Sequence, residues 1–149
     1  MGLFSGLLGR GADETLDTST AVMVPMVAAM LADGDIADEE LRQIRSICVW
    51  SPLYASNSSE RDTEIIRRAM RLVQDLGADV ICERVRATLS PALRETAFIF
   101  AVRLVFSDAH LGAAEQALIE KLVTWLGLAE DRARLLIEAV SIMQHTADA

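Results

Sequence analysis

The sequence contains few cysteines and few aromatic residues, and each shortage limits what the chain can be. Cys48 and Cys82 are the two cysteines. They lie in apolar surroundings, without a CxxC motif or the spacing of metal ligands, so we expect buried free thiols in a reducing compartment. Aromatic residues make up 5% of the chain. Leu, Ala, Ile, Val and Met dominate instead, which is typical of packed helices.

Long hydrophobic segments are also missing. The longest apolar run, residues 21–32, has twelve residues and contains Pro25, so it is too short to span a bilayer. Residues 1–10, MGLFSGLLGR, have a short apolar core that is broken by glycines and followed by a lone Arg. That pattern does not fit a signal peptide, and Gly6 stands where a myristoylation motif has Ser or Thr. We therefore expect a cytoplasmic protein.

Basic residues are scarce. Lys121 is the only lysine, and 14 basic residues face 22 acidic ones, for a net charge of −8. A chain this acidic repels a phosphate backbone, so we expect no nucleic-acid partner. The 149 residues fit one domain, and the apolar fraction of 52% excludes disorder over the whole length.

The pattern of apolar residues indicates an all-α protein, because no segment alternates convincingly with a period of two. We predict about seven helices: from a cap at Thr18 or Ser19 to 31, from a cap at Ala37 to before Pro52, from Ser59 to Gly77, 79–89, from the Ser90-Pro91 start to 106, from a cap at Gly112 to Gly127, and a last helix through Met143. The segment TAFIFAVRLVF (96–106) is apolar nearly all round, which predicts that this helix lies in the middle of the bundle.

These helices predict one domain over residues 19–146, with a flexible segment before it at 1–18 and a frayed tail at 147–149. Two interpretations stay open for residues 1–10: a short contact with a partner or a lipid surface, or a loose chain end. Chain ends are usually loose, which favours the second.

An internal repeat appears when the chain is shifted by 75 residues. The matched pairs are Val24 and Ile99, Val27 and Val102, Leu31 and Phe106, Asp33 and Asp108, Ile36 and Leu111, Glu40 and Glu115, Ile44 and Ile119, Ile47 and Leu122, and Trp50 and Trp125. The apolar matches are expected of any two amphipathic helix pairs. The identical pairs, one each of Asp, Glu and Trp, all fall at this one offset and are harder to obtain by chance. We predict two helical hairpins of one design, packed with approximate two-fold symmetry.

The two matched tryptophans, Trp50 and Trp125, end corresponding helices. We expect them to seal the core near the bases of the hairpins. The alternative is an exposed aromatic pair that forms a groove for a partner, because Trp is favoured at interfaces.

The repeated motif resembles a known family. LADGDIADEE (31–40) is echoed by FSDAHLGAAE (106–115), and this pattern in a helical chain of about this length resembles the TerB-like family of tellurite-resistance proteins, over roughly residues 22–140. The resemblance implies a divalent-cation role for the repeated acids. Related domains occur in bacterial stress systems and on a membrane-anchored J-domain co-chaperone. The second copy departs from the pattern, because Ala109 replaces Gly and His110 stands in the place of Asp35.

Most of the repeated acids also suit helix ends. Glu40 and Glu115 each fall three residues after a candidate cap residue, Ala37 and Gly112, where a carboxylate reaches back to the cap N–H. Asp33 and Asp108 are different. They close the C-terminal turns of their helices, where the negative end of the helix dipole disfavours an acid.

If the two corners converge, the acids form an oxygen-rich pocket that suits Ca²⁺, Mg²⁺ or Mn²⁺, and a histidine would admit Zn²⁺. The predicted metal ligands are Asp33, Asp35, Glu40, Asp108, His110 and Glu115.

Two functions remain open on the sequence. The first is a non-enzymatic TerB-like module that binds a divalent cation and protein partners in a metal, tellurite or envelope stress response. The second is a pure interaction module or co-chaperone-type scaffold whose acids only cap helices, with a homodimer as one form. The sequence has no ExxH pairs of di-iron bundles, no Ser-His-Asp set and no Gly-rich phosphate loop, so we do not expect an enzyme.

Overall fold

Seven α-helices and no strand make up the part of the chain that the computed structural model describes, residues 15–32, 34–106 and 112–148. The helices are α2 (Thr18–Leu31), α3 (Asp38–Val49), α4 (Ser59–Leu76), α5 (Ala78–Thr88), α6 (Pro91–Val105), α7 (Ala113–Leu126) and α8 (Glu130–Met143). The predicted all-α fold is confirmed. None of these helices is long and apolar enough to cross a membrane.

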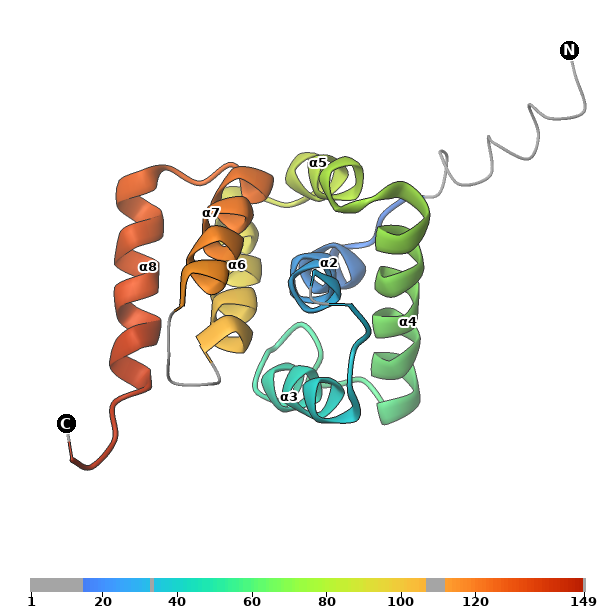
Figure 1. The fold of residues 1–149 in the computed structure, drawn as a ribbon. Coiled ribbons are helices and arrows are strands. Elements are labelled where there is room, and N and C mark those ends of the chain that lie inside the picture. Colours follow the sequence, from blue (N-terminus) through green and yellow to red (C-terminus); the bar gives the residue numbers. More distant parts are fainter. Residues whose placement is uncertain (1–14, 33, 107–111, 149) are drawn as a thin grey trace, which may run out of the picture.

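The helices surround α2. In Figure 1, α4 lies on one side of α2, α6 and α7 lie on the other, and α5 and α3 lie above and below it. Helix α8 forms the outer edge and packs against α6. The bidentate bond from Arg132 to Glu95, at 2.8 and 2.9 Å, also ties α8 to α6. This bond with the Arg132 guanidinium lowers the pKa of the Glu95 carboxyl.

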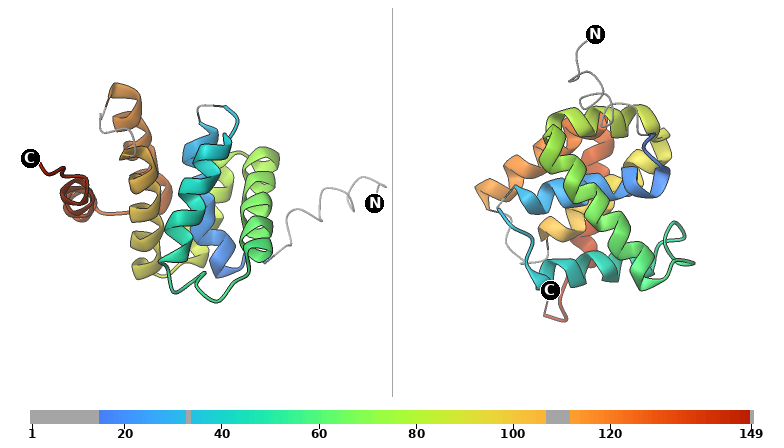
Figure 2. Two further views of the ribbon diagram at one scale, coloured as in Figure 1. Left: turned by 90° about the horizontal axis from the view of Figure 1, so that it is seen from below. Right: turned by 90° about the vertical axis from the view of Figure 1, so that its right-hand side faces the viewer.

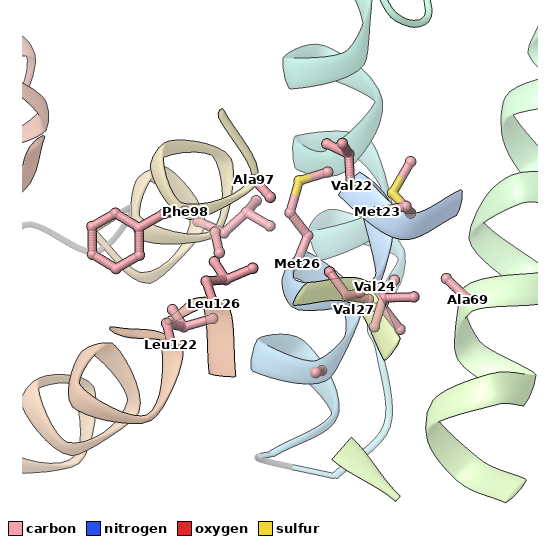
Figure 3. Packing of buried hydrophobic residues seen from close by; sticks show 14 of the residues in the cluster. Val22, Met23, Val24, Met26, Val27, Ala69, Ala97, Phe98, Leu122 and Leu126 are labelled. Atoms are coloured by element: carbon pink, nitrogen blue, oxygen red, sulfur yellow. The ribbon is translucent and has the colours of Figure 1, made fainter. Parts of the chain in front are cut away.

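Helix α2 is central because it carries no charge. Every residue from Thr20 to Ala29 is buried, including Pro25, which α2 accommodates without ending there. Figure 3 shows its Val and Met side chains between Ala69 of α4 and Ala97 of α6. Helix α6 packs against α2, α3, α7 and α8, so its predicted place in the middle of the bundle is confirmed, although α2 is more completely buried. Helix α6 carries Arg94, Glu95 and Arg103, and these side chains need one face near water.

The helix ends follow the predicted chemistry, with shifts of one or two residues. Ser90 caps α6 by accepting from Leu93 N, and Gly127 ends α7 in the left-handed region. Helix α2 is capped by Asp17 rather than by Thr18 or Ser19, because the Asp17 carboxylate accepts from both Thr20 N (2.8 Å) and Thr20 Oγ1 (2.9 Å). Gly77 has φ 82° and ψ 151°, so it joins α4 directly to α5 instead of forming a left-handed cap.

One arginine of α4 belongs to this same corner. Arg67 and Arg71 lie on the exposed side of α4. Arg68 is instead half-buried and donates to Asp17 Oδ2 at 3.1 Å and to the Thr15 carbonyl at 3.4 Å. The start of α2 is thus held against α4 by a charged hydrogen bond.

The two tryptophans have different surroundings. Trp125 is half-buried and packs against the core, whereas 82% of Trp50 is exposed. The prediction that both seal the core was therefore wrong for Trp50. Helix α3 ends at Val49, and its buried residues are Ile44, Ile47 and Cys48, so Trp50 lies past the end of the packed face.

The loop between α3 and α4 is held by Tyr54, which is almost fully buried. Its hydroxyl donates to the Ser19 carbonyl at 2.7 Å. We expect Tyr54→Phe to lower the free energy of unfolding by about 1 kcal/mol, because the hydrogen bond from the Tyr54 hydroxyl to the part-buried Ser19 carbonyl is lost. Urea denaturation measures the change. The exposed Trp50→Phe is the control and should shift stability by no more than about 0.5 kcal/mol; equal effects of the two variants would contradict the role of the hydrogen bond.

Burial also affects the two thiols. It raises the pKa of Cys48 from 9.0 to about 12, with a further contribution from the charge of Asp62. Burial raises the pKa of Cys82 from 9.0 to about 12 as well, with Asp79 adding to the shift. As the pH rises, the thiols deprotonate in the unfolded chain before they deprotonate in the folded protein. The stability that the buried neutral thiols contribute is therefore complete below pH 9 and is lost as the pH rises toward 12.

We therefore expect the wild-type protein to lose about 1.4 kcal/mol of unfolding free energy per thiol between pH 8 and pH 10. The double variant Cys48→Ala, Cys82→Ala should lack this loss, since it has no thiol to titrate. Urea denaturation at the two pH values gives both slopes. If wild type and variant weaken in parallel, the thiols do not control alkaline stability.

Candidate functional site

Both repeated corners contribute to one cavity. Helices α2 and α6 run side by side and end at the same side of the molecule (Figure 2, left). A cavity of about 250 Å³ lies there, lined by the last turns of α2 and α6 and by the first turns of α3 and α7. It includes Glu39, Glu40 and Gln43 from the first corner and Glu115 from the second. The predicted metal site requires the two corners to converge, and in this cavity the two glutamates of the repeat line one space.

Glu40 occupies the position that the helix-cap interpretation assigned to it. It is half-buried, and its Oε2 accepts from the backbone N–H of Ala37 at 3.3 Å. Ala37 is the residue before α3 and has no side chain that caps the helix. The carboxylate thus satisfies the first N–H and lies at the positive end of the helix dipole.

Glu115 lies in the matching position on α7. A Cβ added to Gly112, the residue before α7, would come within 2.7 Å of Glu115 Oε2. The carboxylate therefore folds back over the backbone of the cap residue, as at the first corner. Glycine at position 112 leaves the space that this carboxylate oxygen occupies.

Two further polar side chains complete the wall of the cavity. Glu39 is exposed and forms an ion pair with Arg42 at 3.2 Å. Gln43 lies three residues after Glu40, on the same face of α3. Neither residue is among the metal ligands predicted from the sequence, although the helical period places Gln43 beside Glu40.

The remaining predicted ligands are placed differently. Asp35 follows the turn at Gly34, where φ is 120°, is exposed and does not line the cavity. Asp33, Asp108 and His110 lie outside the described residues. Among the side chains that the structure does describe, no three His, Cys, Asp or Glu residues form a group that could hold a metal ion. The six-ligand set thus stays a prediction, and two of its members, Glu40 and Glu115, share a cavity.

The donors in the cavity are of one chemical kind. Carboxylate oxygens and the amide oxygen of Gln43 are the ligands that Ca²⁺, Mg²⁺ and Mn²⁺ prefer, whereas no thiol or imidazole lines the described part of the wall. Each capping carboxylate has two oxygens, and Glu40 uses Oε2 toward the backbone. Capping and cation binding are therefore compatible at one residue.

A stripe on α7 was missed in the sequence. Glu115, Leu118, Lys121 and Trp125 follow one another at intervals of three, three and four residues, which is the spacing of one helix face. The first two line the acidic cavity, and the last two line a neighbouring groove. Helical periodicity is the signal in the sequence that could have found this face.

Comparison with known proteins agrees with the predicted family. No curated protein and no solved structure matches the chain. The family model described as tellurite resistance protein TerB matches residues 19–136, which include helices α2 to α7, both corners and the cavity between them. The chain belongs to the TerB family of tellurite resistance proteins.

Proposed function

We propose that this protein is a non-enzymatic TerB-type module that binds a divalent cation at the acidic cavity and engages protein partners in a metal, tellurite or envelope stress response. One observation carries the proposal: Glu40 and Glu115, which the repeat pairs in the sequence, line the same cavity from two different hairpins. Helix capping alone accounts for a glutamate at each corner. It does not require the two corners to lie against each other.

Electrostatics supports a cation at this place. Two half-buried carboxylates, Glu40 and Glu115, line one cavity together with Glu39, and of these three acids only Glu39 forms an ion pair within the described part of the chain, with Arg42. Carboxylates that share a partly buried site repel one another, and a divalent cation removes that repulsion. Asp33 and Asp108 belong to the same two corners in the sequence and would add carboxylate oxygens, while His110 would add a ligand that admits Zn²⁺.

The alternative function is a pure interaction module or co-chaperone-type scaffold. The bond from Ala37 N to Glu40 favours it, because this bond gives the acid a purely structural task. The exposed Trp50, next to the exposed Val49, supplies an apolar anchor for a protein partner or for a second copy of the chain. Both functions include partner binding, so the cation separates them.

We expect calorimetry on the chelator-treated protein to detect binding of Ca²⁺, Mn²⁺ or Zn²⁺ with one ion per chain. Asp33→Asn, Asp108→Asn, Glu40→Gln and Glu115→Gln should each weaken it, because one ion would be shared by both corners. The unfolding free energy should rise by about 2.7 kcal/mol at a cation concentration one hundred times the Kd, because the ion binds the folded state.

The matched control is Asp131→Asn. Asp131 is an exposed acid in the first turn of α8, so its loss changes the net charge equally but leaves both corners intact. Its cation affinity should equal that of wild type. An absence of binding at millimolar metal, with a melting temperature unchanged by chelator, would contradict the cation proposal and leave the scaffold function.

A further inference from the structure

A second hollow lies beside the acidic cavity. It is a groove of about 450 Å³ between the end of α2, the α4–α5 junction and α7, lined mainly by small and medium apolar side chains. Helices α2, α5 and α7, which contribute to its lining, lie next to one another in Figure 1. Its volume is in the range of about 300–1,000 Å³ that ligand sites occupy. A smaller hollow, which contains Ala32, Glu115 and Lys121, connects the groove to the acidic cavity.

One wall of the groove is an oriented indole. Trp125 is half-buried, and its Nε1 donates to Asp79 Oδ1 at 2.8 Å. Asp79 is in the first turn of α5, so the bond links α7 to α5 and holds the ring in place. A fixed aromatic ring loses little conformational entropy when an apolar group packs on it. Val80, whose side chain is 48% exposed, extends this apolar wall toward the surface.

The rim of the groove carries one cation. Lys121 is exposed and forms no ion pair with any residue in the described ranges. The carboxylate that shares the groove, Asp79, is already bonded to the indole of Trp125. An apolar floor with an unpaired ammonium beside it complements a group that is apolar at one end and anionic at the other.

We propose that this groove docks a segment of a partner protein that places a large apolar side chain against Trp125 and an adjacent Asp or Glu carboxylate beside Lys121. The groove is open to solvent, which suits a peptide chain that passes over it. The net charge of −8 repels a strongly acidic segment, so the segment that fits carries one or two acids next to its apolar residue. The proposal names a place for partner binding and does not require the cation.

A displayed library of random peptides tests the chemistry of the groove. Peptides selected on the full chain, in the presence of EDTA, should share a large apolar residue with Asp or Glu within a few positions. Lys121→Glu should lose this consensus. Arg67→Glu, the same charge reversal at an exposed position of α4 outside the groove, should keep it. No consensus, a basic consensus, or an acidic consensus that survives Lys121→Glu would each overturn the proposal.

A synthetic peptide with the selected sequence then tests the position. In the Trp50→Phe background, Trp125 is the only tryptophan, so its emission should shift as the peptide binds. Lys121→Glu should weaken binding about tenfold or more, and Trp125→Leu should abolish it while circular dichroism shows a folded protein. Binding that leaves the emission of Trp125 unchanged would overturn the proposal. A further result would also overturn it: no peptide consensus is found, but the wild-type protein self-associates and Lys121→Glu removes this self-association. The occupant of the groove would then be a second copy of the chain.

The use of EDTA separates this proposal from the cation site. If peptide binding fails while calorimetry still detects the cation, only the groove proposal is wrong. If the cation is not detected and the peptide binds at the groove, only the cation proposal is wrong.

Discussion

An uncharged helix has to be covered on every side, and the position of the candidate site depends on that constraint. From Thr18 to Leu31 the sequence has no charged residue, so exposing any face of α2 would leave apolar surface in water at a cost of about 25 cal/mol per Å². Helices α4, α5, α6 and α7 all pack on α2. Because α6 lies beside α2 and ends at the same side, the corners that follow the two helices line one cavity.

The acids at these corners contact the backbone at the starts of their helices and also line the cavity. Glu40 satisfies the N–H of Ala37, and Glu115 folds over Gly112. These contacts place both carboxylates at the positive ends of α3 and α7, where the helix dipoles stabilise them. The helix-cap interpretation and the ligand interpretation therefore do not compete for the same atoms. A cap that fixes the orientation of a carboxylate also prepares it to bind an ion at low entropic cost.

Sequence reasoning succeeded where the structure is determined locally. The cap at Ser90, the stop at Gly127 and the helical character of every described element follow from residue chemistry within a few positions. It failed where packing between distant segments decides. The burial of α2 from Thr20 to Ala29 and the exposure of Trp50 depend on which helices lie beside them. The bond between Trp125 and Asp79 joins residues 46 positions apart, and no local pattern predicts such a pair. The exact symmetry of the two hairpins stays a prediction.

The central claim is that one cation is shared by the two corners, and paramagnetic broadening by Mn²⁺ tests it most directly. In amide spectra of the isotope-labelled protein, the first turns of α3 and α7 should broaden together as Mn²⁺ is added at less than one equivalent. Both should recover when Mg²⁺ or Ca²⁺ displaces it, while the first turn of α8 stays sharp throughout. Broadening at one corner alone, or uniform weak broadening along all three helices, would contradict a shared site.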